Sequence, residues 1–307
     1  MNDYVAVIGA ANIDLGGQPR NPLVYKDSNP GVISIGFGGV GRNIAHNLCK
    51  LGVPVKLFTT VGEDALGKDL LDNCRHLGMD ISNVLINKGE TSSMYMYIND
   101  EEGDMALALA HVKIDSKLTP EYFSDKMDIL NNAKFVVIDC NISPEAFEYL
   151  THNCKSPIFV DPVSQAQSRK IGKNLGLINT IKPNTLEAEF LTGMTIRTLE
   201  DAKSAARYLI ETGIKRVFMS MGEKGILAAD SERMELVPAC PTEMVCATGA
   251  GDSSMAAIIW SLFNGNEDIT LAAQAANAAA SLTIESIDTI NPKLSAESVA
   301  LKIKEVY

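Results

Sequence analysis

Short apolar runs alternate along the chain with segments in which apolar residues recur at helical spacing. The apolar runs predict buried strands at 4–10, 55–62, 134–140, 157–162, 178–184 and 216–222. The intervening segments predict helices at 41–51, 64–77, 144–154, 185–192 and 199–212. Alternation of this kind indicates an α/β fold, with a parallel sheet covered by helices on both faces.

Two segments, 15–37 and about 90–112, interrupt this pattern because they lack helical periodicity. The second contains "SSMYMYIND" followed by "EEGDMALALAHV", which predicts a hairpin around Gly103. We expect the two segments to form a small β-sheet inserted into a single domain that spans residues 1–307. Such a sheet could close over a crevice as a lid, or pair with another subunit.

Polar residues follow the predicted strands at or just after their ends. Ligands of parallel sheets gather beyond the carboxyl ends of the strands. We therefore expect one crevice to be surrounded by Asn12, Asp14, Asn141, Asp161, Lys182, Asn184 and Gly222.

Charge and composition narrow the classes of partner. The 307 residues carry a formal net charge of −11, which argues against a nucleic acid or a membrane surface as partner. A phosphate ligand would have to be held by local amides and a few placed cations. The 6 cysteines form no CxxC pair, as expected of free thiols in a reducing cytosol. The first residues show no signal peptide, and no apolar run reaches the ~18 residues of a membrane span, so we expect a cytoplasmic protein.

The stretch "CATGAGDSSMAAIIW" (246–260) places Gly249 and Gly251 just before an apolar run at helical spacing. A helix N-terminus with unpaired amides suits an anion, whereas an aspartate there would repel one. Asp252 has two interpretations. It could cap the helix, a role that the following serines could fill equally well. Alternatively, it takes a proton from a hydroxyl that attacks a phosphoryl group, while the amides of residues 250–252 stabilise the developing charge.

Two further motifs are ambiguous when taken alone. "FGGVGRNIAHNL" (37–48) is either a glycine-rich turn or a close backbone approach to a polar ligand, with Asn43 bonding to it. In "IKPNTLEAEFL" (181–191), Asn184 and Glu187 form either a capping box or a site for Mg²⁺ and phosphate oxygens. "MSMGEKG" (219–225) predicts a glycine turn between strands. No GxGxxG follows the first strand, which argues against a dinucleotide-binding dehydrogenase.

The order of these motifs resembles the ribokinase-like (PfkB) carbohydrate kinase family over essentially the whole chain. The matching pieces are an N-x-D after the first strand, GGxGxN, "VGEDALG" (61–67), KPNxxE and TGAGD. The resemblance implies a three-layer α/β/α ribokinase-like fold with a small β-sheet lid that often mediates dimerisation, so we expect a homodimer.

Within that family the chain is most similar to the bacterial pseudouridine kinases. This likeness rests on "GAANID" (9–14), "DSNPG" (27–31), "GGVGRNIA" (38–45), "DCNIS" (139–143), "VDPVS" (160–164) and "KPNTLEAE" (182–189). It implies ATP-dependent phosphorylation of the 5′-hydroxyl of pseudouridine, giving pseudouridine 5′-phosphate and ADP.

The resemblance also implies a role for each matching residue. Asp252 would be the catalytic base, beside an anion hole formed by Gly249, Ala250 and Gly251. The ribose hydroxyls would be bound by Asp14, Gly39 and Asn43, with Asn12 beside them. Asn141 stands where ribokinases often have a sugar-binding glutamate. Asn184 and Glu187 would organise the ATP phosphates and Mg²⁺, with Glu187 as the residue that binds the metal. Ser220 and Gly222 match the nucleotide-binding turn, and Asn277 lies near the adenine pocket.

One position departs from the family pattern. Many relatives have an aspartate six residues before the base, in a loop that binds K⁺, and here that residue is Cys246. A thiol is a poor ligand for a hard cation, so the resemblance gives little support for K⁺ binding. Backbone carbonyls could still supply a weaker site.

Two alternatives to pseudouridine phosphorylation stay open at this point. The first is a kinase of the same family that acts on ribose, a fructose phosphate or adenosine. A fructose phosphate would need cations, and the substrate loops offer only Arg20 and Lys26. The second is a catalytically silent nucleoside-binding regulator, against which the intact TGAGD and KPNTLE motifs argue.

Overall fold

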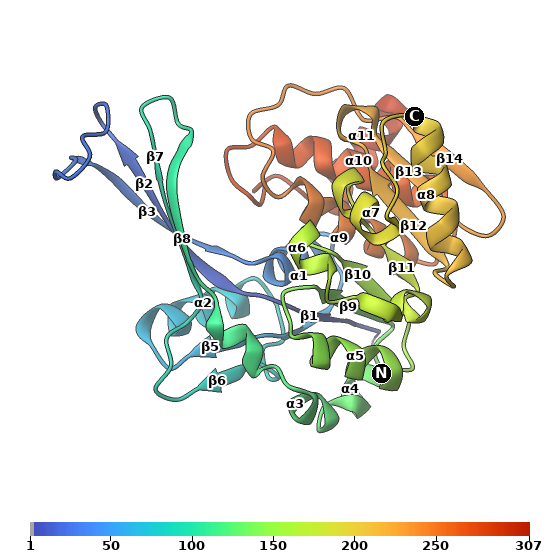
Figure 1. The fold of residues 1–307 in the computed structure, drawn as a ribbon, viewed down its shortest axis with the longest axis horizontal. Coiled ribbons are helices and arrows are strands. Elements are labelled where there is room, and N and C mark those ends of the chain that lie inside the picture. Colours follow the sequence, from blue (N-terminus) through green and yellow to red (C-terminus); the bar gives the residue numbers. More distant parts are fainter. Residues whose placement is uncertain (1–2) are drawn as a thin grey trace.

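The computed structural model describes residues 3–307, and an eight-stranded sheet forms its centre (Figure 1). In sheet order its strands are β14 (Met234–Val237), β13 (Ile226–Ala229), β12 (Arg216–Ser220), β11 (Thr180–Ile181), β10 (Ile158–Asp161), β9 (Phe135–Asp139), β1 (Val5–Ile8) and β4 (Val55–Phe58). The parallel pairs run from β12 to β4, whereas β12, β13 and β14 pair antiparallel. The sheet is therefore mixed, and the prediction of a parallel sheet was wrong at this edge.

All six predicted strands are shorter than their apolar runs, and two of the runs differ most from the strands observed. The run at 55–62 divides into β4 and β5 (Thr60–Gly62), which pairs with β6 (Leu85–Asn87) in a separate two-stranded sheet. The division occurs because β1 ends at Ile8, in register with Phe58, so the chain beyond Phe58 has no neighbour in the central sheet. The run at 178–184 contributes only the two residues of β11, after which the chain bends toward a helix.

Helices cover both faces of the central sheet, as the alternation predicted. One face carries α1 (Val40–Lys50), α2 (Ala65–His76), α9 (Ala250–Phe263), α10 (Ile269–Ile284) and α11 (Ala296–Val306). The other carries α3 (Pro120–Ser124), α4 (Met127–Asn131), α5 (Pro144–Asn153), α7 (Thr185–Thr192) and α8 (Leu199–Glu211). Short helical segments complete the chain: α6 (Gln165–Ser168), η1 (Lys113–Lys117), η2 (Gly172–Leu177) and η3 (Gly222–Lys224).

Two separate cores result from this layering. Along β1, Val5 and Val7 pack into one core while Ala6 and Ile8 pack into the other, because successive side chains of a strand point to opposite faces. All are fully buried. The predicted helices agree with α1, α2, α5, α7 and α8 to within a residue, since each carries an apolar stripe toward one core.

The small sheet contains β3 (Gly31–Gly38), β2 (Asn12–Pro19), β7 (Met94–Asn99) and β8 (Met105–His111), in that order. It projects from the body of the molecule as a four-stranded ribbon (Figure 1). The hairpin around Gly103 joins β7 to β8, as predicted. β2 begins at Asn12, four residues after β1 ends, so the small sheet grows directly out of the central one.

The small sheet has one polar and one apolar face. Register places Ile33 and Ile35 of β3 across from Gly17 and Leu15, and continues through Ile98 and Met96 to Leu107 and Leu109. Of these, the isoleucines of β3 and the leucines of β8 are 57–79% exposed. Asp14, Gly16 and Tyr95 belong to the opposite face. The structure thus has the predicted fold class, in which helices cover a central sheet and a second, smaller sheet lies beside it.

Candidate active site

A cavity of about 900 Å³ lies at the carboxyl ends of the central strands. Its walls come from residues that end or follow β10, β11 and β12 and from the first turn of α9. Among the lining residues are Asp161, Lys182, Asn184, Ser220 and Asp252. Of the strand-end residues expected to share a crevice, Asp161, Lys182, Asn184 and Gly222 line this cavity, whereas Asn12, Asp14 and Asn141 do not.

The first turn of α9 faces this cavity with free amides. Gly249 begins the helix with φ +85°, and a Cβ on it would lie 2.0 Å from the carbonyl oxygen of Thr289. Within residues 3–307, no side chain caps this helix, and no acceptor contacts the amides of Ala250, Gly251 or Asp252. These N–H groups and the helix dipole make an anion site that a ligand can occupy.

Asp252 does not cap α9, so the first of its two interpretations is wrong. Its Oδ2 instead accepts a hydrogen bond from Asn43 Nδ2 of α1 at 2.9 Å. The serines that could also have capped the helix bond elsewhere, Ser253 to the carbonyls of Ala250 and Ala279, and Ser254 to that of Ala276.

The environment of Asp252 makes its carboxyl group unusually basic. Burial and the nearby charge of Asp161 raise its pKa to about 7, although the bond from Asn43 and the charge of Lys182 oppose the shift. A carboxyl with a pKa near neutrality can both accept and release a proton at physiological pH.

Asp14 lies on β2 and is the second predicted aspartate with a raised pKa. Asn12 Nδ2 donates a hydrogen bond to Asp14 Oδ1, and burial raises the pKa of Asp14 to about 6. A Cβ on Gly38 would lie 2.1 Å from Asp14 Oδ2. Gly39 has φ +95°, and its Cβ would lie 2.4 Å from the carbonyl oxygen of Ala10. The glycines before α1 therefore allow residues 38–39 to lie close to residues 10–14.

Asp139, for which the sequence predicted no role, holds these segments together by hydrogen bonds. It is fully buried at the end of β9. Its Oδ2 accepts from the amides of Ala10 at 2.9 Å and Gly41 at 2.7 Å, and its Oδ1 accepts from Asn141 N at 2.9 Å. Asn141 is thereby held beside the start of α1. Only the "DCNIS" motif hinted at this, because an aspartate that ends a buried strand needs buried donors.

Asn184 and Glu187 form a complete capping box at the start of α7. Glu187 accepts from the amide and the Nδ2 of Asn184, both at 2.9 Å, and Asn184 Oδ1 accepts from Glu187 N at 2.9 Å. Both residues also line the large cavity. The box fixes the carboxylate in place and leaves lone pairs on its oxygens for other donors.

The remaining predicted residues line the same cavity further along. Ser220 pairs with Asn184 through an isolated β-bridge, and Gly222 begins the turn between β12 and β13 with φ +59°. Asn277 of α10 uses its amide to hold the carbonyls of Val237 and Pro238, both at 3.0 Å. The structure thus divides the predicted residues into two groups, which are joined by the hydrogen bond from Asn43 to Asp252. Asn184, Glu187, Ser220, Gly222 and Asn277 line the cavity, whereas Asn12, Asp14, Gly39, Asn43 and Asn141 lie outside its lining.

One ion pair in the cavity wall is almost completely buried. Lys182 Nζ lies 3.3 Å from Asp161 Oδ2, and the two side chains are 6% and 8% exposed. Burial by itself lowers the pKa of Lys182, but the carboxylates around it outweigh this and raise the value above its usual range.

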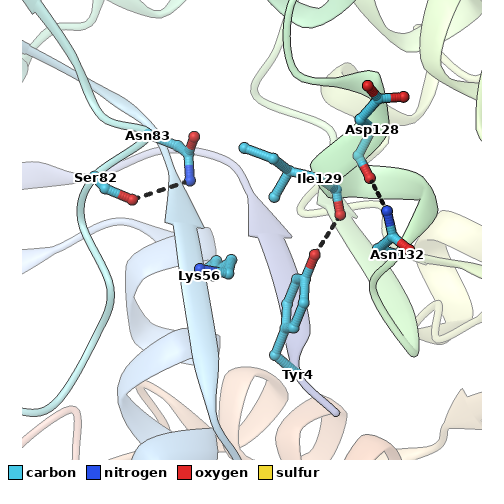
Figure 2. Close-up of a pocket in the computed structure, with 7 residues that line it drawn as sticks. All are labelled: Tyr4, Lys56, Ser82, Asn83, Asp128, Ile129 and Asn132. Carbon is cyan, nitrogen blue, oxygen red and sulfur yellow. Dashed lines mark hydrogen bonds between the residues drawn. The ribbon is translucent and has the colours of Figure 1, made fainter. Parts of the chain in front are cut away.

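A second, smaller cavity of about 430 Å³ lies at the opposite edge of the sheet, beside Tyr4 and Lys56 (Figure 2). Tyr4 precedes β1, and its hydroxyl donates to the carbonyl of Ile129, while Lys56 pairs with Asp80. Parallel α/β folds bind ligands at the other edge. In the described part of the chain, no group of three or more metal-ligating side chains occurs.

Comparison with known proteins agrees with this geometry. The model of the pfkB family of carbohydrate kinases matches residues 2–296. Pseudouridine kinase from Escherichia coli strain K12 is 40% identical over 258 residues, which cover 83% of this chain and 82% of that protein. The uncharacterised sugar kinase YeiI from the same strain is 32% identical over 298 residues, covering 96% and 82%.

A solved structure shows the same arrangement of elements. The crystal structure of a candidate sugar kinase from Clostridium perfringens matches with a TM-score of 0.91 and 30% identity, covering 100% of this chain and 97% of that one. Together with ribokinase structures of the same fold, this likeness confirms the ribokinase-like fold class. No helix within residues 3–307 is long and apolar enough to cross a membrane.

Proposed function

We propose that this chain, which belongs to the pfkB family of carbohydrate kinases, transfers the γ-phosphoryl group of ATP to the 5′-hydroxyl of pseudouridine. The products would be pseudouridine 5′-phosphate and ADP. The observation that carries the proposal is Asp252, a carboxylate held by Asn43 at the uncapped start of α9. The choice of pseudouridine rests on the 40% identity to the E. coli enzyme.

In this reaction Asp252 is the general base. It accepts the proton of the 5′-hydroxyl as the oxygen attacks phosphorus, and its pKa of about 7 suits that transfer. Asn43 holds the carboxylate by a single bond, which leaves the other oxygen for the substrate. Phosphoryl transfer needs mainly positioning and charge neutralisation, so a modest base is sufficient.

The amides of Ala250 and Gly251 act as the anion hole. They lie in the first turn of a 14-residue helix and have no acceptor of their own in the described structure. Negative charge on the transferred group would meet preorganised N–H donors rather than water, which stabilises the transition state. Gly249 makes the arrangement possible by its positive φ.

The ribose would lie against the polar side of β2. Asp14 and Asn12 bond to one another there, and Gly39 lets the chain pass close by. A ribose presents vicinal hydroxyls, which pair with a carboxylate and an amide as donor and acceptor. Asn141, held by Asp139, would reach another hydroxyl or an edge of the uracil ring.

ATP and Mg²⁺ would occupy the large cavity. Mg²⁺ usually binds through one or two carboxylates together with phosphate oxygens and water, so the absence of a three-carboxylate cluster in residues 3–307 is compatible with it. Glu187 lines the cavity and fits this pattern. When bound, the ion would neutralise phosphate charge. Ser220 and Gly222 would contact the nucleotide, and Asn277 would shape the adenine end by holding two carbonyls.

A kinase for a different acceptor is the second candidate, favoured by the 32% identity to a sugar kinase. An ADP-release assay with Mg-ATP and, in parallel, pseudouridine, uridine, adenosine and ribose separates the two. We expect a strong preference for pseudouridine. Preference for another acceptor would overturn the substrate and keep the kinase, whereas release with none of them would favour a nucleoside-binding regulator.

Replacing the base tests the chemistry itself. We expect Asp252→Asn to lower kcat by about 10²–10⁴-fold, because an amide cannot accept the proton. Nucleoside affinity, measured by calorimetry, should change little because the bond from Asn43 can persist. Turnover close to that of the parent would refute this role for Asp252.

The small sheet would serve as a lid and as a dimer interface. Its polar face carries Asp14, and its other face exposes the isoleucines of β3 and the leucines of β8. Contiguous exposed apolar side chains on a sheet usually mark an interface. A second copy of the chain is the partner we propose for it.

A further inference from the structure

The cavity proposed to hold ATP is lined by far more negative than positive charge. Its acidic lining residues are Asp161, Glu187, Glu223 and Asp252, and Lys182 is the one basic residue that lines it among those described. With all four carboxyls ionised, four negative charges against one positive leave a net charge of −3 before any nucleotide enters. A polyanion that binds there needs every available cation, and Lys182 is the cation that the chain itself provides.

Lys182 lies directly beside the anion hole. Its Nζ is 3.5 Å from the position that a Cβ on Gly251 would occupy, so the ammonium lies against the first turn of α9. Lys182 is 5% exposed. It directly follows the two-residue strand β11, so its backbone is held at the carboxyl end of that strand. An ammonium at this place and the amides of the helix would contact the same phosphoryl group.

The ammonium is incompletely paired. It has three N–H donors, and the structure described here records one ion pair for it, to Asp161 at 3.3 Å. That separation is longer than a strong charge-assisted hydrogen bond, for which about 2.7–2.9 Å is usual. Because Lys182 lines the cavity, a ligand oxygen there can accept from the remaining donors.

We propose that Lys182 is a catalytic residue that binds the γ-phosphoryl oxygens during transfer, and that Asp161 is a positioning residue that holds the ammonium in the absence of nucleotide. This inference rests on the proposed kinase function. The bond between the 5′-oxygen and phosphorus forms, and the bond between phosphorus and the bridging oxygen breaks with its electron pair passing to ADP. The hydroxyl proton passes to Asp252, and Lys182 keeps its protons throughout.

The competing explanation is structural, namely that Lys182 only neutralises the buried carboxylate of Asp161. Removing one member of a buried ion pair is destabilising, whereas removing both together is much less so. We therefore compare Lys182→Met, Lys182→Arg and the double variant Asp161→Asn with Lys182→Met. Lys56→Met is the matched control, since Lys56 also pairs with an aspartate but lies at the distant cavity of Figure 2.

We expect Lys182→Met to lower kcat by about 10²–10³-fold, the usual effect of removing one transition-state donor. Lys182→Arg should recover part of the loss, and the double variant should recover the melting temperature but not turnover. Calorimetry supplies a readout besides activity. ADP affinity should change less than about threefold, whereas the tighter binding of ADP with aluminium fluoride and nucleoside, a mimic of the transferring group, should be lost.

Turnover close to the parent value in the double variant would overturn the proposal, as would unchanged binding of the mimic by Lys182→Met. The acceptor that the parent enzyme prefers is used throughout, so a substrate other than pseudouridine overturns only the substrate assignment. If the parent transfers phosphate to no acceptor, both proposals fail. Lys56→Met should keep parental kcat in every case.

Discussion

At the scale of single residues, the proposed site depends on two carboxylates with different neighbours, of which Asp139 is fully buried and Asp252 is partly buried. Asp139 accepts three backbone hydrogen bonds and holds the chain, whereas Asp252 accepts one bond from a side chain. Both have raised pKa values because burial disfavours their charged forms. The number of fixed donors separates a structural carboxylate from one that is free to exchange a proton.

The raised pKa of Asp252 predicts the pH dependence of the reaction. Below about pH 7 its carboxyl is protonated and cannot accept the hydroxyl proton, so kcat should rise with pH and level off above about 7. The groups that shape this titration are Asp161 and Asp139, which raise the pKa, and Lys182, which lowers it. Initial rates at saturating substrates between pH 5.5 and 8.5 provide the measurement.

As a control, the residual kcat of Asp252→Asn is measured over the same pH range. It should not rise near neutrality, because the variant lacks the titrating carboxyl. A flat profile in the parent, with stable protein at every pH, would contradict the assignment of the base.

At the scale of elements, α9 shows how one helix is used differently at its two ends. Gly249 before it and Gly265 after it both have φ +85°. A Cβ on Gly249 would lie 2.0 Å from the carbonyl oxygen of Thr289, whereas a Cβ on Gly265 would have no atom within 4 Å. Substitutions at the two glycines therefore distinguish the cost of a left-handed backbone, which both share, from the cost of a steric clash, which only Gly249 would have.

Alanine at the two positions should have unequal effects. Gly265→Ala should cost about 1–2 kcal/mol, the penalty of a left-handed backbone for an L-residue, with kcat unchanged. Gly249→Ala should lose a further ~1–3 kcal/mol through overpacking and should lower kcat, because the amides of the anion hole would move. Denaturant unfolding and steady-state kinetics measure both. Equal losses of stability would show that the contact with Thr289 does not matter.

The capping box of α7 is the other element that serves the site. Its bonds are those of an ordinary helix start, yet they also hold Glu187 toward the cavity. The structural and functional interpretations of this motif are therefore compatible, since the cap orients the carboxylate that we propose for Mg²⁺.

At the scale of the whole molecule, the small sheet has the proposed substrate residue Asp14 on one face and exposed apolar side chains on the other. Ile33 of β3 is 79% exposed and Leu109 of β8 is 60% exposed, on the face opposite Asp14. If two chains pair through this face, the polar side of each sheet would be held over its own crevice. Lid position and assembly would then be coupled.

Charged substitutions on the apolar face test this arrangement. We expect the parent to sediment as a dimer, and Ile33→Lys with Leu109→Lys to sediment as a monomer, because burying an ammonium without a partner is unfavourable. The KM for the nucleoside should rise in the variant. Analytical ultracentrifugation measures the mass, and Tyr25→Lys, an exposed apolar residue outside the strands, is the control. A monomeric parent would refute the dimer.

The sequence by itself determined the α/β class, the extents of α1, α2, α5, α7 and α8, and the motifs from which the site is predicted. These follow from local periodicity and from residue chemistry, which neighbours along the chain suffice to define. Turn glycines and the helix start at Gly249 were predictable for the same reason, since positive φ and unpaired amides are local properties.

Only the tertiary structure decided the antiparallel edge of the sheet, the division of the 55–62 run and the pairing of Asn43 with Asp252. Each depends on which strands or helices become neighbours, and residues 209 positions apart meet in the last case. The hydrogen bonds of Asp139 and the ion pair of Lys182, on which its proposed role rests, are of the same kind. A buried charge is defined by the partners that surround it, and those partners come from separate elements that packing alone brings together.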